Sequence, residues 1–157
     1  MTTHPVLKFT WDTDADRDVA LPGYETAGAA GADIRANLAP ADRAAGLTLN
    51  PMQRGLVPTG LRVEIPGGFE MQLRPRSGLA LKHGLTLLNT PGTIDSDYRG
   101  PLGVIVINLG ETAYSIRHGD RIAQLIVAPV VQAGVELVET LGDTVRGSGG
   151  FGSTGQA

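Results

Sequence analysis

The chain is 157 residues long, carries a formal net charge of −3 and contains no cysteine. This composition excludes a disulfide scaffold, a thiolate zinc site, an iron–sulfur cluster and a cysteine nucleophile. The 22 glycines and 10 prolines argue against long helices, and the acidic balance argues against a broad nucleic-acid surface. No stretch approaches the roughly 18 apolar residues of a membrane span, so we expect a cytoplasmic protein without nucleic-acid or membrane partners.

Alternation of apolar and polar residues is the strongest local signal along the chain. It predicts strands at 61–65 and 69–74, and the Pro-Gly-Gly sequence at 66–68 predicts the turn of a hairpin between them. Ser77 is the expected N-cap of one or two helical turns that end before Gly84. Further strands are expected at 6–9, 47–49, 85–88, 104–109, 114–117, 122–127 and 135–138, and a surface loop at 35–55.

About nine short strands separated by turns predict an all-β fold, a jelly-roll-like β-sandwich, which we assign as one domain over residues 1–145. Residues 102–109 are almost continuously apolar, which is typical of a strand covered on both faces or packed against another subunit.

Residues 146–157 read RGSGGFGSTGQA, which by composition is a flexible C-terminal arm. A pure linker has no use for one arginine and one phenylalanine. An arm that folds over a ligand would use them as a phosphate clamp and a stacking ring, and a disordered end without function is the alternative.

Four segments place charge and glycine where the strand pattern stops. Residues 30–34 (AGADI) begin a strand with one carboxylate, which could also simply close a turn. Residues 74–80 (RPRSGLA) combine a guanidinium, a hydroxyl and the amides of a helix start, a combination that binds phosphate readily. Residues 89–100 (NTPGTIDSDYRG) form a dense loop between strands, and 119–125 (GDRIAQL) are either a site or only a turn with an ion pair. The acidic segment 12–18 has no assigned role.

Taken in this order, with the glycine-rich arm as a fifth, these segments closely resemble the five motifs of the homotrimeric dUTP pyrophosphatases (dUTPases) over residues 30–155. The resemblance implies the dUTPase-like β-clip, a trimer whose sites are shared between subunits, and an arm that closes over the ligand. It implies dUTP as substrate and Mg²⁺ as cofactor. The reaction would give dUMP and pyrophosphate, which keeps uracil out of DNA and supplies dUMP for dTMP synthesis.

The same resemblance assigns roles to single residues. Asp95 would be the general base that activates a water for in-line attack on the α-phosphorus, and Asp33 would contact Mg²⁺ through water. The loop that starts at Asn89 would hold uracil, and Tyr98 would pack on the deoxyribose. Gln124 would donate toward the α/β-phosphates, Arg146 would neutralise the γ-phosphate and Phe151 would stack on uracil. The full set of expected substrate-binding residues is Arg76, Ser77, Gly78, Asn89, Gly92, Thr93, Ile94, Tyr98, Gln124, Arg146, Phe151, Gly152 and Ser153.

Two other functions stay open. A dCTP deaminase of the same superfamily would share the jelly roll and the Arg-Ser pair, but it needs an additional acid/base near the pyrimidine. No glutamate of the chain lies in a matching motif. A trimeric module that binds the nucleotide without hydrolysing it is the second alternative, and the intact Asp95 and arm argue against it.

Overall fold

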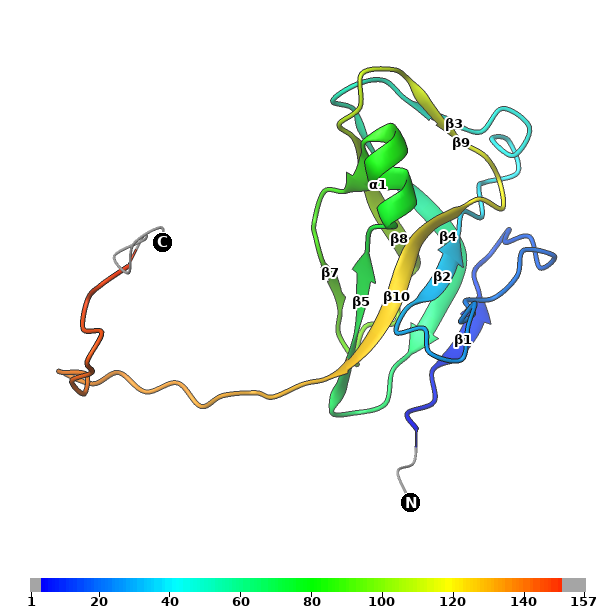
Figure 1. Cartoon of the computed structure of the whole chain (residues 1–157). Coiled ribbons are helices and arrows are strands. Elements are labelled where there is room, and N and C mark those ends of the chain that lie inside the picture. Colours follow the sequence, from blue (N-terminus) through cyan, green and yellow to red (C-terminus); the bar gives the residue numbers. More distant parts are fainter. Residues whose placement is uncertain (1–3, 151–157) are drawn as a thin grey trace.

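The computed structural model describes residues 4–150 and confirms the predicted all-β fold. Two four-stranded antiparallel sheets, ordered β1-β4-β8-β6 and β2-β10-β5-β7, form the body, and a β3-β9 pair and one helix lie toward one end (Figure 1). The elements are β1 (Lys8–Trp11), β2 (Ala32–Arg35), β3 (Leu47–Leu49), β4 (Arg54–Glu64), β5 (Phe69–Arg74), α1 (Ser77–His83), β6 (Leu85–Leu87), β7 (Gly92–Ile94), β8 (Leu102–Asn108), β9 (Tyr114–Ile116) and β10 (Arg121–Pro129).

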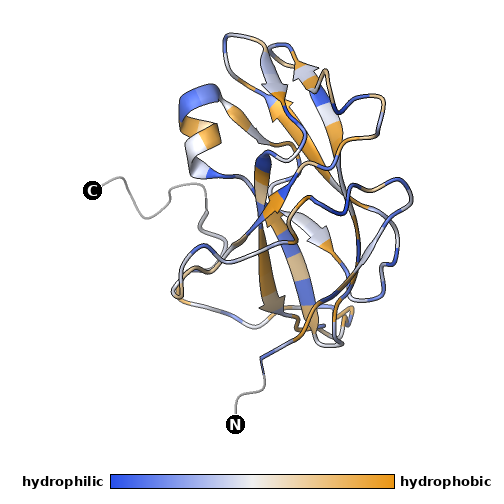
Figure 2. Cartoon of the chain, turned by 90° about the vertical axis from the view of Figure 1, so that its right-hand side faces the viewer, coloured by the Kyte–Doolittle hydropathy of each residue, from blue (hydrophilic) through white to orange (hydrophobic). Residues whose placement is uncertain are grey.

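The hydrophobic core forms where the strands turn their apolar residues inward. In β4, Val57, Leu61 and Val63 are buried, and Val104 and Val106 of the paired strand β8 are almost fully buried. Figure 2 shows the resulting alternation of hydrophobic and hydrophilic residues along the strands. Burial of one such side chain contributes about 1.5–3 kcal/mol, so packing of the sheets holds the strands that carry the site.

The predicted hairpin between 61–65 and 69–74 is wrong, although both strands exist. Strand β4 pairs with β1 and β8, whereas β5 pairs with β10 and β7 in the other sheet. The Pro-Gly-Gly turn at 66–68 therefore carries the chain across the sandwich. Both strands bury one face in the same core, so they lie opposite each other instead of side by side.

Helix α1 begins one position earlier than the sequence predicts. Arg76 is the N-cap residue with extended backbone angles and makes no side-chain cap, so the predicted capping role of Ser77 is wrong. The predicted end is confirmed, because Gly84 has a left-handed φ of 66° and its N–H bonds to the carbonyl of Ala80. The helix thus places Arg76 at the junction between β5 and the first helical turn.

Three other sequence predictions need correction. The strand expected at 47–49 is confirmed as β3, but the surrounding segment 35–55 is not wholly a surface loop, because Ala36, Asn37 and Leu38 are buried where the chain continues from β2 into the core. The first strand lies at Lys8–Trp11 instead of 6–9, since it pairs with the end of β4. No strand forms at 135–138, where Val135 and Leu137 are 98% and 99% exposed.

The chain leaves the body after β10. The last main-chain contact with the body is the N–H of Val130, which donates to the Gly68 carbonyl at 2.9 Å, and the described residues after it extend away from the sheets as a tail up to residue 150 (Figure 1). Several valines and leucines of this tail are exposed, although such side chains are usually buried in a folded chain. No helix among the described residues is long and apolar enough to cross a membrane.

Candidate active site

Six residues that the sequence assigns to substrate binding and catalysis meet at one cavity of about 340 Å³. It lies between edge strand β7 and the outer face of β4 and β8, and apolar side chains such as Leu56 and Ile105 form its other walls. The predicted residues that line it are Asn89, Gly92, Thr93, Ile94, Asp95 and Tyr98.

The entry to β7 is built around Asn89 and Gly92. A Cβ at Gly92 would lie 3.1 Å from Nδ2 of Asn89, so glycine lets the amide lie against the main chain. A cis peptide joins Thr90 to Pro91 between them, and the Thr90 hydroxyl donates to the Leu87 carbonyl. The turn and strand β7 present the Asn89 side-chain amide and main-chain groups to the cavity. Such donors and acceptors can hydrogen-bond to the edge of a planar polar ring.

Tyr98 folds back over the loop that follows β7. Its hydroxyl donates to the Pro101 carbonyl at 2.9 Å, and its N–H donates to the Asp95 carbonyl at 3.1 Å. A Cβ at Gly100 would lie 2.3 Å from the Tyr98 hydroxyl, so only glycine permits this fold. Arg99 ties the same loop by donating from Nη1 to the carbonyls of Ser96 and Tyr98.

Asp95 is exposed at the mouth of this cavity and also borders a second, polar hollow that contains Glu70 and Asp97. Within residues 4–150 no hydrogen bond engages the Asp95 carboxylate. A carboxylate held at a cavity mouth and open to solvent is able to accept a proton from a water molecule.

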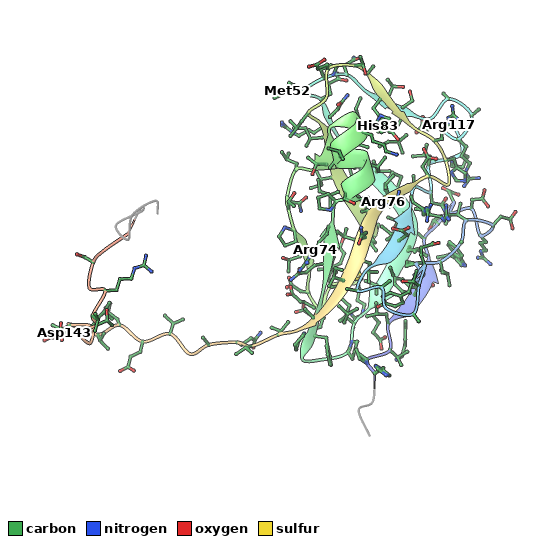
Figure 3. The ribbon with its side chains drawn as sticks, viewed as in Figure 1. Met52, Arg74, Arg76, His83, Arg117 and Asp143 are labelled. Carbon is green, nitrogen blue, oxygen red and sulfur yellow. The ribbon has the colours of Figure 1, made fainter. Side chains whose placement is uncertain are left out.

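A second group of predicted residues surrounds Arg76. Its Nε donates to Oδ1 of Asp33 at 3.1 Å, and Nη2 approaches Oδ2 at 3.4 Å, a fork-like pairing that fixes the guanidinium plane. Arg121 donates to the same Oδ2 at 3.0 Å. Figure 3 shows Arg76 between helix α1 and strand β10, and Ser77 and Gly78 follow it in the first turn of the helix.

A polar cavity of about 270 Å³ opens beside Arg76. Arg35, Arg121, Asp120 and Tyr114 also line it, and burial raises the pKa of the Tyr114 phenol. Sequence reasoning missed Arg35 and Arg121 as part of this cavity. Arg121 could have been found from the sequence, because it lies within the GDRIAQL segment that was singled out as a candidate site. Arg35 could not, because only the pairing of β2 with β10 brings it to the cavity.

Asp33 is the residue that the sequence links to a metal ion. Its side chain is only 11% exposed, and the two guanidinium groups occupy three of the roughly four lone-pair positions of its oxygens. One position on Oδ1 is left for a water molecule. Within the described residues no cluster of three acidic or histidine side chains offers a direct metal site.

Gln124 lies on β10, where it pairs with Asp33 on one side and with Arg74 on the other. Gln124 therefore lies on the same strand as Arg121, and its cross-strand neighbour Asp33 is the residue that binds Arg76. Arg146 is exposed on the tail, where its Nε donates to the Gly149 carbonyl. Phe151, Gly152 and Ser153 lie outside the described residues.

One chain does not bring the two groups together. Strand β5 separates them, since Gln124 pairs with its residue 74 while Ile94, next to Asp95, pairs with its residue 71. Three residues along a strand and two strand spacings across the sheet amount to about 14 Å. The two cavities share no lining residue. Asp95 is therefore too far from Gln124 to act on the same phosphate within one chain.

Comparisons with known proteins agree on one family. The family model for dUTPase matches residues 17–155. Deoxyuridine 5'-triphosphate nucleotidohydrolase of Roseobacter denitrificans is 64% identical over 149 residues, which cover 95% of each chain. The same enzyme of Dinoroseobacter shibae is 62% identical over 151 residues, or 96% of each chain. The solved dUTPase of Staphylococcus bacteriophage 80alpha with dUPNHPP has a TM-score of 0.81 at 25% identity and covers 96% of this chain and 99% of that one.

Proposed function

Because the chain belongs to the dUTPase family, it hydrolyses dUTP to dUMP and pyrophosphate, and we propose that Asp95 is the general base. The observation that carries this proposal is the single cavity lined by Asn89, residues 92–95 and Tyr98. Asp95 stands at its mouth, where a water could lose its proton to the carboxylate as it attacks the α-phosphorus in line. A carboxylate is a weak base near neutral pH, so positioning and charge neutralisation supply most of the acceleration.

The cavity fits a deoxyuridine. The Asn89 amide offers both a donor and an acceptor to the polar edge of uracil, and the backbone of Gly92, Thr93 and Ile94 supplies further groups. The Tyr98 ring, held by its bond to the Pro101 carbonyl, would pack on the deoxyribose and leave no space for a 2′-hydroxyl. A snug turn at Asn89 would likewise exclude the 5-methyl group of thymine.

The triphosphate would lie along Arg76, Ser77, Gly78 and Gln124. Arg76 is already oriented by Asp33, so little side-chain entropy is lost when it binds a phosphate oxygen. Mg²⁺ carried by the triphosphate oxygens would neutralise their charge, and the free lone-pair position of Asp33 fits contact through one of the metal's waters.

We propose that the active form is a homotrimer with shared sites. The separation of about 14 Å between the position of Gln124 and that of Ile94, the neighbour of Asp95, supports this, because a second copy must then supply the missing half of each site. The tail supports it as well, since the valines and leucines between 130 and 145 lie exposed in one chain. Arg146, Phe151, Gly152 and Ser153, in the arm over residues 146–157, would then reach the nucleotide and close over it.

The experiment that tests these roles measures pyrophosphate release from dUTP, UTP, dTTP and dCTP, first with Mg²⁺ and then with excess chelator. We expect release from dUTP alone, weakened by the chelator. Equal release from UTP would contradict the role of Tyr98, and equal release from dTTP would contradict the role of the turn at Asn89. Loss of ammonia from dCTP would instead favour the deaminase.

A further inference from the structure

Arg121 contacts two carboxylates of very different exposure. Its Nη1 lies 3.0 Å from Oδ2 of Asp33 and 3.3 Å from Oε1 of Glu25. Asp33 is 11% exposed and is fixed by Arg76 as well, whereas Glu25 is 60% exposed and belongs to the loop before β2. The contact of Arg121 with Asp33 is therefore a fixed part of the site. Its contact with Glu25 is one that solvent or a ligand can replace.

Among the groups that pair directly here, the charges do not balance without Glu25, since Arg35 and Asp120, which also line the cavity, carry opposite charges that offset each other. Arg76 and Arg121 carry two positive charges and share the one negative charge of Asp33. Arg76 also donates from Nη1 to the main-chain carbonyl of Arg121, so the two arginines form one connected unit. Glu25 supplies the remaining negative charge, and it does so from the exposed side.

The unit borders the polar cavity of about 270 Å³, which both arginines line. Arg121 is itself 37% exposed there. A phosphate group that binds Arg76 would thus also meet the guanidinium of Arg121. The partner of that guanidinium, Glu25, is an exposed side chain that a ligand can displace. Phosphate oxygens accept from guanidinium groups more strongly than a single exposed carboxylate oxygen does, because they form charge-assisted pairs at several oxygens.

We propose that Arg121 is a further phosphate-binding residue of the triphosphate site and that Glu25 is its counter-ion until the substrate displaces it. This rests on the assignment of Arg76 to the triphosphate. Glu25 then competes with the polyphosphate for one guanidinium and weakens the binding of dUTP and of the product pyrophosphate. Because exposed ion pairs are weak, the competition amounts to a factor of about two to five in affinity.

The test uses the full-length protein, with KM for dUTP and the inhibition constant of pyrophosphate as readouts. We expect Glu25→Gln to lower both constants by about two- to fivefold, and Arg121→Gln to raise both by about tenfold. In the Arg121→Gln background, Glu25→Gln should have no further effect, since the competing pair no longer exists. Glu111→Gln, which makes the same change of charge in the exposed loop between β8 and β9, is the matched control and should leave both constants unchanged.

The remaining outcomes would contradict either the proposed roles of Arg121 and Glu25 or the assignment of the triphosphate site. A Glu25→Gln protein with unchanged constants, or one that changes equally with and without Arg121, would overturn the inference. If Arg121→Gln does not fold, Arg121→Lys replaces it, because lysine keeps the charge near Asp33 and loses the fork that binds phosphate. Arg76→Gln separates the two failures: if it also leaves pyrophosphate inhibition unchanged, the assignment of the triphosphate site itself is wrong.

Discussion

Gly31 lies directly beneath the side chain of Gln124. A Cβ at position 31 would stand 2.5 Å from Oε1 and 3.2 Å from Cβ of Gln124, and 3.1 Å from Cδ1 of Ile126. We therefore expect Gly31→Ala to push the Gln124 amide away from the position that we propose for it beside the triphosphate. The kcat/KM for dUTP should fall by about tenfold or more, the cost of one hydrogen bond to a charged group.

The matched control is Gly28→Ala, in the same loop, where a Cβ would meet no atom within 4 Å. Steady-state kinetics of Gly28→Ala should equal those of the parent protein. In a double mutant with Gln124→Ala, the alanine at position 31 should cost little more. An equal loss in the presence and absence of the Gln124 amide would mean that Gly31 acts on the fold and not on the glutamine.

Asp95→Asn removes the proposed base and keeps the shape of the cavity. Hydrolysis of dUTP should fall by at least about 100-fold, while dUTP still binds, because the amide cannot take a proton from water. Pyrophosphate release measures the first effect, and calorimetric titration with dUTP measures the second. Asp97→Asn, two residues away in the same loop, is the control, and hydrolysis at the parent rate by Asp95→Asn would remove Asp95 from the mechanism.

Deletion of residues 146–157 should leave the proposed trimer intact and reduce turnover severely. The described body ends its last strand at Pro129, so the sheets do not depend on the arm. Sizing of the truncated chain by light scattering, together with its kcat/KM, checks both statements. A truncated chain that no longer folds would show that the arm is structural.

The acidic segment 12–18 contributes to stability through Asp12. Two nitrogens of Arg62 donate to its Oδ1 at 3.0 and 2.9 Å, and these bonds hold the pKa of Asp12 below its ordinary value of 3.8. A pKa lowered by folding stabilises the protein above the ordinary value, and the contribution disappears as pH falls through the folded value. We expect Asp12→Asn to unfold at lower urea concentration than the parent near pH 6, with the difference closing below about pH 3.8.

Asp14→Asn is the control for this pH dependence. It makes the same change of charge in the same segment, at a position whose φ of 65° suits asparagine. Its urea midpoint should stay close to that of the parent protein over the whole range. A gap between Asp12→Asn and the parent that persists at the lowest pH would mean that lost packing, not lost charge, explains the effect.

Local patterns predicted the strands better than they predicted how the strands are arranged. The alternation at 61–65 and 69–74 correctly marked two half-buried strands, but alternation tells only that one face is buried and not in which sheet. The hairpin failed for this reason. The strand predicted at 135–138 failed for a related reason, because a strand needs a partner and none lies beside it within residues 4–150.

The candidate site divides in the same way. The six predicted residues of the cavity that holds Asn89 and Tyr98 come from one contiguous segment, 89–98, so they were predictable from their order in the chain, whereas its walls from β4 and β8, such as Leu56 and Ile105, were not predicted. The contact of Glu25 with Arg121 joins segments nearly a hundred residues apart, as their numbering shows, and depends on how β2 pairs with β10. No spacing rule in the sequence encodes such a pair.

In the homotrimer that we propose, the distance between Asp95 and Gln124 also means that two defective chains can repair each other. A trimer that mixes Asp95→Asn chains with Gln124→Ala chains contains a site built from the intact half of each. Neither variant would hydrolyse dUTP well alone, yet unfolding and refolding them together should restore activity. Each active site then depends on residues from two copies of the chain. One defective copy therefore inactivates only the sites to which it contributes its altered residue.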